Sequence, residues 1–299
     1  MATDQTTRSA YVALVGRPNV GKSTLLNAMV GTKVSIATRR PQTTRHLIHG
    51  VVEHGGAQLV FVDTPGLHVQ EPRAINRVLN RAAAGAMQDV DAIVWLIEAL
   101  RWTEEDRAVA ERLSGQTAPV IVAVNKVDRV ADKTKLLPYL GDRAAEFSAA
   151  DWIPLAARDG TNVDRLLDLL AARAQPGPLL FPDGEVTDRP VRFQIAEILR
   201  EKLITQLDRE IPYALTVELE RYDDNGRTAH IDAVIWVERE SQKAIVIGHQ
   251  GAVQKRAGTR ARAELERLLD RKVVLRTWVR VREGWSDDER ALAQFGYSE

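Results

Sequence analysis

A glycine-rich stretch, Gly16-Arg-Pro-Asn-Val-Gly-Lys-Ser-Thr24, constrains the fold of this 299-residue chain more than any other feature. It matches the pattern G-x-x-x-x-G-K-[ST] of phosphate-binding loops. Residues 10–15 before it have the apolar pattern of a buried strand, and residues 23–30 after it have the pattern of a helix. In that context the backbone N–H groups and the helix dipole face an anion. The stretch therefore predicts a nucleoside triphosphatase.

Two side chains of this loop have specific tasks in such an enzyme. Lys22 is placed to bridge the outer phosphates, and the Ser23 hydroxyl is placed to bind Mg²⁺. The other loop residues that we expect to contact the nucleotide are Gly16, Asn19, Val20, Gly21 and Thr24.

A second motif, Asp63-Thr-Pro-Gly66, follows an apolar strand predicted at 58–62. A carboxylate at such a strand end is where nucleoside triphosphatases hold Mg²⁺. Gly66 lacks a side chain, which lets its N–H approach the γ-phosphate. The pattern D-x-x-G is weak by itself, because Asp and Gly are common in turns. Its position after a phosphate-binding loop favours the functional interpretation.

A third motif, Asn125-Lys-Val-Asp128, follows a strand predicted at 119–124. The carboxylate of Asp128 can accept hydrogen bonds from N1–H and the 2-amino group of guanine. Adenine offers neither donor there, so the carboxylate would stay unpaired beside ATP. Together with Asn125 and Lys126, this residue predicts a site for GTP and GDP.

The first half of the chain alternates apolar strands with helical segments, which predicts a doubly wound α/β domain with a mostly parallel sheet. Further strands are predicted at 47–53, 92–98 and 152–155, and helices at 72–87 and 163–173. A stretch rich in proline and glycine, 175–184, marks the end of this domain. We predict a GTP-binding domain at 1–175, a linker at 176–188 and a second domain at 189–299.

The second half has the order helix, strand, strand, helix, helix, strand. A loop with the pattern Ile-Gly-x-x-Gly lies between the last two helices, as in KH domains, where it clamps the backbone of about four nucleotides. We therefore predict an α+β KH domain of type II. Residues 252–282 carry ten Lys or Arg against three Asp or Glu, which favours RNA binding over the alternative of a solvated helix face. The elements are predicted at 190–207, 214–221, 230–238, 252–269 and 273–282, and the RNA contacts at Ile247, Gly248, His249, Gln250, Gly251, Lys255, Arg256 and Arg260.

Composition excludes several other classes of protein. The net charge is zero, so the overall charge indicates no particular partner. There is no cysteine, which excludes a disulfide framework and thiolate metal sites. No apolar run approaches the roughly 20 residues that cross a bilayer. Residues 1–9 lack the apolar core of a signal peptide. We expect a soluble, cytoplasmic monomer.

Motifs along nearly the whole chain carry a family resemblance. They are 16–23, Gln42-Thr-Thr-Arg-His46, 63–67, 125–128, Arg200-Glu-Lys-Leu203, 246–248 and Gly284-Trp-Ser-Asp-Asp-Glu-Arg-Ala-Leu292. In these the chain resembles the Era family of bacterial ribosome-assembly GTPases. The resemblance implies a GTPase switch that binds the 3′ end of small-subunit (16S) ribosomal RNA and assists 30S subunit assembly and rRNA processing. It also implies peripheral association with the cell membrane, although no membrane-binding segment is evident in the sequence.

The switch requires a metal ligand that depends on the γ-phosphate. We expect Thr44 to complete Mg²⁺ coordination beside Ser23 and Asp63 only when that phosphate is present, with the adjacent Thr43 as the alternative. Hydrolysis would then release the loop at 31–46. The expected catalytic residues are Lys22, Asn19 and Thr44.

Some positions depart from the common pattern. Leu67 follows D-T-P-G, and its apolar side chain cannot orient the attacking water, so we expect slow turnover. Resemblance to related GTPases places Asn19 to bind an activating K⁺. On the guanine side, Ala156 stands where the family usually has serine, which leaves a backbone contact from Ala157. The residues His249-Gln250 stand where a lysine is common in the KH loop.

Three alternatives stay open. The chain could be a constitutive RNA-binding protein whose nucleotide site only stabilises the fold. It could be a GTPase whose second domain binds protein, in which case partner binding would not depend on salt. The weakest alternative is an ATPase, which equal competition by ATP and GTP would favour.

Overall fold

The computed structural model describes residues 7–38, 40, 43–66, 73–207 and 211–297. The chain divides into two compact units, each with its own hydrophobic core. The first unit takes in residues 1–37, 44–71 and 79–188, and the second takes in residues 38–43, 72–78 and 189–299.

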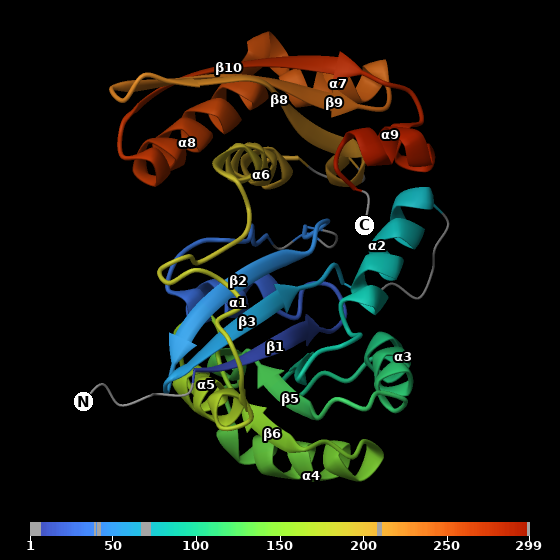
Figure 1. Ribbon diagram of the computed structural model, residues 1–299. Helices are drawn as coiled ribbons and strands as arrows, with labels where there is room; N and C mark the ends of the chain where they lie inside the picture. The colour runs from blue at the N-terminus through green and yellow to red at the C-terminus, as the bar shows by residue number, and fades with distance from the viewer. Residues whose placement is uncertain (1–6, 39, 41–42, 67–72, 208–210, 298–299) are drawn as a thin grey trace, which may run out of the picture. The chain divides into compact units, whose positions relative to one another are not determined.

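The first unit is built on a seven-stranded sheet with the strand order β2-β3-β1-β4-β5-β6, in which β7 also pairs with β1 (Figure 1). The strands are β1 (Arg8–Val15), β2 (Ile48–His54), β3 (Ala57–Asp63), β4 (Ala92–Glu98), β5 (Val120–Asn125), β6 (Asp151–Pro154) and β7 (Gln175–Pro176). The strands run parallel except that β2 pairs antiparallel with β3, and β7 with β1. The predicted mostly parallel sheet is confirmed.

Helices cover both faces of this sheet, which explains why β3 and β5 are apolar and buried along nearly their whole length. These helices are α1 (Lys22–Val30), α3 (Glu104–Leu113), α4 (Leu136–Glu146) and α5 (Val163–Ala171). Helix α2 (Ala74–Gly85) is divided between the units, since residues 74–78 belong to the second and the rest to the first. Helices α1 and α5 pack on one face. The core under the other face centres on Trp95, whose ring meets Phe147 edge-on at 5.0 Å. Helix α4 was not predicted from the sequence. Its apolar residues Tyr139 and Leu140 pack against this core but are only partly buried, and Pro138 and Gly141 interrupt the helical pattern.

The segment after α5 is bonded to the first unit. Gln175–Pro176 pairs with the start of β1. The Gln58 side chain donates to the carbonyl oxygen of Phe181 and accepts from its N–H, both at 2.9 Å. The Val51 N–H donates to the carbonyl oxygen of Val186 at 3.0 Å. Much of the predicted linker therefore lies along this sheet.

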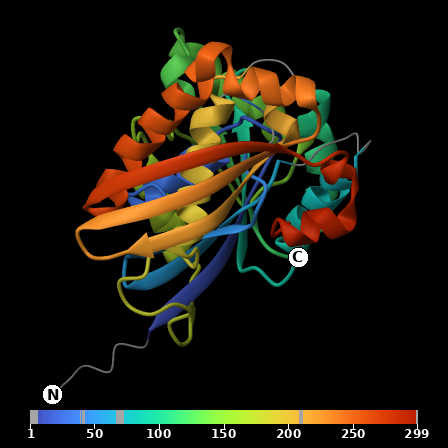
Figure 2. The same ribbon diagram turned by 90° about the horizontal axis from the view of Figure 1, so that it is seen from above.

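The second unit has a three-stranded sheet of order β10-β9-β8, in which β9 is parallel to β10 and antiparallel to β8 (Figure 2). Its elements are α6 (Val191–Ile204), β8 (Leu215–Asp224), β9 (Thr228–Val237), α7 (Glu240–Ile247), α8 (Ala252–Leu269), β10 (Lys272–Val281) and α9 (Glu289–Gln294). The predicted order up to β10 is confirmed, and the short α9 is an addition. Among the described helices, none is both long and apolar enough to cross a membrane.

Helix α8 shows how the sequence specifies this unit. Ala257, Ala261, Leu265 and Leu269 recur every four residues and are all buried. That spacing puts them on one helix face, which packs into a core shared with α6 and the sheet. The intervening positions are largely polar and exposed.

Leu265→Ala is therefore expected to lower the free energy of unfolding by about 2–5 kcal/mol, because it leaves a cavity in this core. Urea unfolding measures the loss. Leu268→Ala is the matched control, since Leu268 is 40% exposed on the same helix, and it should stay within about 0.5 kcal/mol of the parent. Equal losses in the two variants would contradict the assignment of the buried face.

Candidate functional site

The sequence motifs meet at the carboxyl end of the parallel sheet of the first unit. Gly16 follows β1, Asp63 ends β3, Asn125 ends β5, and Ala156 follows β6. Parallel strands bring the loops that follow them to the same edge of a sheet, which is where ligands of doubly wound folds bind. The three predicted motifs therefore form one site.

Lys22, at the start of α1, is buried at this edge. Its Nζ donates to the carbonyl oxygens of Gly16 at 3.0 Å and Arg17 at 3.2 Å. Burial lowers the pKa of Lys22 to about 8; the carboxylate of Asp63 opposes this shift, and the charge of Arg17 adds to it. A buried ammonium held by loop carbonyls is suited to an anion, and a nearby phosphate chain would raise the pKa of Lys22 again.

Asp63 is fully buried close by. Its Oδ2 accepts hydrogen bonds from the hydroxyls of Ser23 at 2.7 Å and Ser35 at 2.9 Å, and the Thr44 hydroxyl lies 3.5 Å away. Burial raises the pKa of Asp63, while the charge of Lys22 and these hydroxyls oppose the rise. Its other oxygen, Oδ1, is buried and accepts no hydrogen bond from any residue that the structure describes.

These groups fit Mg²⁺. A buried carboxylate oxygen without a partner, beside two hydroxyls 2.8 Å apart on Ser23 and Thr44, offers the oxygen ligands that this ion takes in nucleoside triphosphatases. Thr43 is engaged elsewhere, since its hydroxyl donates to the carbonyl oxygen of Arg40 at 2.7 Å. Of the two candidate threonines, the structure brings Thr44 to Asp63.

Ser35 is a member of this group that the sequence analysis missed. It lies in the polar loop after α1, where no pattern distinguishes it. The Asn27 side chain fixes that loop: its Oδ1 accepts from the N–H groups of Val34 and Ser35, and its Nδ2 donates to the Ser35 carbonyl oxygen at 2.7 Å. One asparagine therefore positions a hydroxyl next to the predicted metal ligand.

At two positions, Gly21 and Gly66, another part of the chain lies too close for any side chain. A Cβ on Gly21, which has φ 111°, would lie 2.3 Å from Asn125 Nδ2. A Cβ on Gly66 would lie 3.0 Å from backbone atoms of Pro18. The phosphate-binding loop thus touches both the segment after β3 and the segment after β5. Leu67, predicted to leave the attacking water unoriented, lies outside the described residues.

On the base side, Asn125 joins three loops. Its Nδ2 donates to the Val20 carbonyl oxygen at 2.7 Å, and its Oδ1 accepts from the N–H of Ala157 at 3.0 Å. Since that N–H is engaged by Asn125, a guanine contact from Ala157 stays a prediction. Ala156 is buried and its N–H donates to the Thr161 carbonyl oxygen, whereas Asp128 is exposed.

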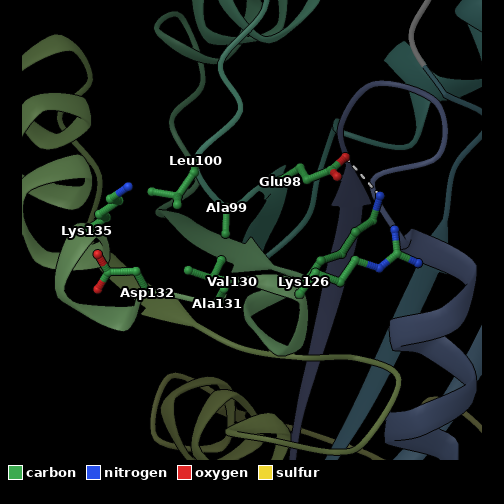
Figure 3. Close-up of a pocket in the computed structure, with 9 residues that line it drawn as sticks. Glu98, Ala99, Leu100, Lys126, Val130, Ala131, Asp132 and Lys135 are labelled. Carbon is green, nitrogen blue, oxygen red and sulfur yellow. Dashed lines mark hydrogen bonds and ion pairs between the residues drawn. The ribbon is translucent and has the colours of Figure 1, made fainter.

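A pocket of about 350 Å³ opens beside Lys126 (Figure 3). Its wall is formed by residues that follow β4 and β5, among them Glu98, Leu100, Asp132 and Lys135. Neither Asp128 nor Ala157 lines it. Of the predicted base-side residues, only Lys126 lines the pocket, which lies beside the others.

In the second unit, the turn between α7 and α8 has the backbone that its glycines predict. Gly248 has φ 75°, and a Cβ there would lie 2.5 Å from Val253 Cγ2. Gln250 is also left-handed, at φ 49°. His249, Gln250, Lys255, Arg256 and Arg260 are exposed, whereas Ile247, Gly248 and Gly251 are partly buried. The turn and the start of α8 thus present an exposed basic surface.

Comparisons with known proteins agree with both halves of this description. A family model described as "50S ribosome-binding GTPase" matches residues 11–126, and one described as "KH domain" matches residues 210–286. The chain is 49% identical to GTPase Era from Azotobacter vinelandii, covering 99% of both chains. It is 49% identical to GTPase Era from Pseudomonas aeruginosa, covering 98% of this chain and 96% of that one.

Solved structures give the same result. Era in complex with MgGDPNP and nucleotides 1506–1542 of 16S ribosomal RNA matches with a TM-score of 0.94 at 34% identity, covering 98% of this chain and all of that one. A variant of Aquifex aeolicus Era bound to GDP·AlF₄⁻ matches with the same TM-score, identity and coverage.

Asp128→Asn is expected to weaken GDP binding about 100-fold or more, because two hydrogen bonds to a charged acceptor are lost, each contributing about 1.5–3 kcal/mol. Binding of xanthosine diphosphate should strengthen, since its 2-oxo group can accept from the new amide. Competition with a fluorescent GDP analogue measures both. Asp142→Asn, on the exposed face of α4, is the control. An unchanged preference for guanine in Asp128→Asn would contradict this role.

Proposed function

This chain belongs to the Era family of GTPases, and we propose that it is a GTP-controlled switch that binds the 3′ end of 16S ribosomal RNA and assists 30S subunit assembly and rRNA processing. The observation that carries the proposal is the presence in one chain of two intact sites. One is the phosphate site with Lys22 and Asp63, and the other is the exposed KH turn at 248–251. The solved relative that matches along 98% of this chain contains that RNA segment.

The reaction is hydrolysis of GTP to GDP and phosphate. Mg²⁺, held by Ser23, Thr44 and Asp63, would neutralise charge on the β- and γ-phosphates. Lys22 supplies a further positive charge from the loop, and the backbone N–H groups of that loop orient the phosphate chain. Activation by K⁺ at Asn19 is part of the proposal, and equal rates with K⁺ and Na⁺ would refute it.

RNA recognition is assigned to the turn at 248–251 and to the exposed cations Lys255, Arg256 and Arg260 on α8. Single-stranded RNA suits this arrangement, because a KH turn clamps the backbone while exposed cations neutralise phosphates. We place the protein in the cytoplasm as a monomer that acts on the 30S subunit, with peripheral membrane association as a further part of the proposal.

The decisive experiment measures the affinity for a single-stranded oligonucleotide from the 3′ end of 16S ribosomal RNA. Binding should be at least about tenfold tighter with a non-hydrolysable GTP analogue than with GDP, because we expect Thr44 to complete Mg²⁺ coordination only when the γ-phosphate is present. Lys22→Ala should abolish the difference while retaining the basal RNA affinity.

Other outcomes separate the alternatives. Equal RNA affinity in both nucleotide states would favour a constitutive RNA-binding protein with a structural nucleotide site. No RNA binding, together with salt-independent capture of a ribosomal protein, would favour a protein-binding second unit. ATP competing as well as GTP would favour an ATPase.

His249→Lys is expected to tighten RNA binding several-fold at low salt and to steepen the slope of log affinity against log salt by about 0.7, because it adds one phosphate contact in the turn. Titrations at several salt concentrations measure both. Ala145→Lys adds the same charge to the exposed face of α4 in the first unit, and it should leave the slope unchanged. If the two variants behave alike, the turn does not contact phosphate.

A further inference from the structure

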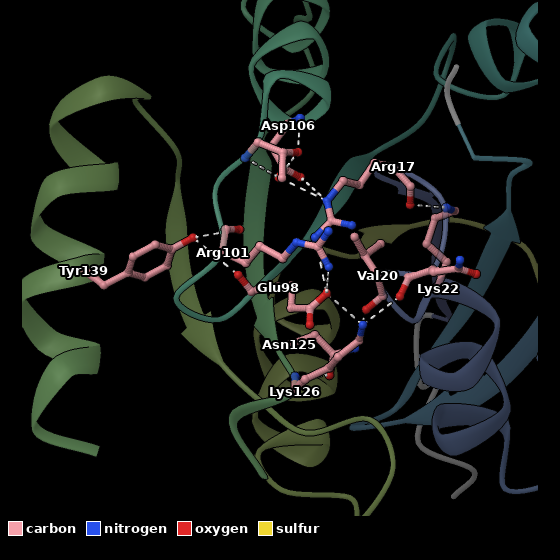
Figure 4. Close-up of polar contacts among 11 residues, drawn as sticks. Arg17, Val20, Lys22, Glu98, Arg101, Asp106, Asn125, Lys126 and Tyr139 are labelled. Carbon is pink, nitrogen blue, oxygen red and sulfur yellow. Dashed lines mark hydrogen bonds and ion pairs between the residues drawn. The ribbon is translucent and has the colours of Figure 1, made fainter. Parts of the chain in front are cut away.

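A series of charged hydrogen bonds connects the phosphate-binding loop to α3 and to the base-side lysine (Figure 4). Arg17, the second residue of the loop, is only 4% exposed. Its Nε lies 3.2 and 3.1 Å from the two carboxylate oxygens of Asp106, and its Nη2 donates to Glu98 Oε2 at 3.3 Å. A buried guanidinium between two carboxylates is a fixed point, because its planar fork holds both partners in one geometry.

Asp106 is anchored independently of Arg17. It is fully buried in the first turn of α3, where it forms a capping box with Thr103. The Thr103 N–H and hydroxyl donate to Asp106 Oδ2 at 3.0 and 2.8 Å. The series therefore begins at a rigid helix end.

Glu98, the last residue of β4, links Arg17 to Lys126. The same oxygen that accepts from Arg17 also accepts from Lys126 Nζ at 2.9 Å. Lys126 Nζ in turn donates to the Asn19 carbonyl oxygen at 2.8 Å. Burial alone would raise the pKa of Glu98, but hydrogen bonds and charge from Lys126 and Arg17 bring it below its usual value.

The turn after β4 holds Glu98 in place. Leu100 has φ 58°, and the Arg101 N–H donates to the Glu98 carbonyl oxygen at 3.1 Å. The Tyr139 hydroxyl, from α4, lies 3.4 Å from the carbonyl oxygens of Glu98 and Arg101. The pocket of Figure 3 opens beside this turn, and the side chains of Glu98 and Lys126 that line it are each 18% exposed.

The two residues joined by the bond from Lys126 Nζ to the Asn19 carbonyl oxygen both have a left-handed backbone conformation. Asn19 has φ 63° and Lys126 has φ 66°, and neither is glycine. Left-handed conformations at such residues persist only where the surroundings determine them strongly. The carboxylate of Glu98, held by Arg17, is the charged group that draws Lys126 across to the loop.

We propose that Asp106, Arg17 and Glu98 are positioning residues that hold Lys126 against the phosphate-binding loop and thereby set the affinity for guanine nucleotides. In the described structure their side chains do not contact the group formed by Ser23, Ser35, Thr44 and Asp63, and the Arg17 backbone carbonyl oxygen that accepts from Lys22 is present in every side-chain variant. Their effect therefore falls equally on GDP and GTP and leaves the hydrolysis of bound GTP unchanged. The inference rests on nucleotide binding at this site and is independent of RNA recognition, so nucleotide alone tests it.

The test is Glu98→Gln, which keeps the shape of the side chain and removes its charge. The dissociation constant of GDP and the KM for GTP should both rise about tenfold, because one charge-assisted contact to Lys126 is lost. The value of kcat should stay within about twofold, and GDP should dissociate faster. Glu104→Gln, an exposed carboxylate in the same turn of α3 as Asp106, is the matched control and should change none of these quantities.

A double-mutant cycle separates positioning from a general effect on the fold. In a Lys126→Met background, Glu98→Gln should have no further effect on GDP affinity. An unchanged affinity in Glu98→Gln, or the same loss in both backgrounds, would overturn the proposal.

Arg17→Lys provides a second variant in case Glu98→Gln does not fold. It keeps a cation beside Asp106 but cannot hold both carboxylates at once. GDP binding should weaken in the same sense, with no further loss in the Lys126→Met background. Wild-type affinity in Arg17→Lys would also overturn the proposal.

Discussion

The burial of two opposite charges, Lys22 and Asp63, at the carboxyl end of the sheet is the constraint on which the nucleotide site depends. Burial lowers the pKa of Lys22 to about 8 and raises that of Asp63, so the protein alone stabilises neither charge fully. A bound phosphate chain would place negative charge beside the Lys22 ammonium, and a cation would place positive charge beside the Asp63 carboxylate. Nucleotide binding thus relieves an electrostatic cost of the folded state, and stability is linked to nucleotide concentration.

Much of this arrangement follows from the sequence, because its determinants are local. Each nucleotide motif comes directly after an apolar strand, and parallel strands place such ends together without any knowledge of side-chain contacts. Helix α8 was predicted as a basic helix after the glycine turn, with the bounds 252–269 that it has, and its buried residues recur every four positions. The same reasoning distinguished the KH unit from the first unit, whose strands and helices alternate.

The remaining features depend on contacts between distant parts of the chain. The bond between Arg17 and Glu98 joins residues 81 positions apart, and each looks ordinary in its own segment. Helix α4 was missed because Pro138 and Gly141 interrupt its pattern and its apolar residues are only partly buried. Trp278 is 42% exposed, since alternation along β10 places the neighbouring Val279 in the core instead. Local patterns therefore predict elements and motifs, while they do not predict the side chains that connect them.

The two sides of the site differ in the kind of bond that holds them. On the phosphate side, neutral hydroxyls of Ser23 and Thr44 contact one carboxylate oxygen, and such bonds can exchange for metal ligands when the γ-phosphate arrives or leaves. On the base side, the contacts of Lys126 and Arg17 are charge-assisted and end at the capped start of α3. The bonds on both sides end on a carboxylate, but on the base side the donor is charged as well, which adds Coulomb attraction between the partners. A rigid base side lets the protein retain guanine nucleotide in both states while the phosphate side changes, which is the property that a nucleotide switch requires.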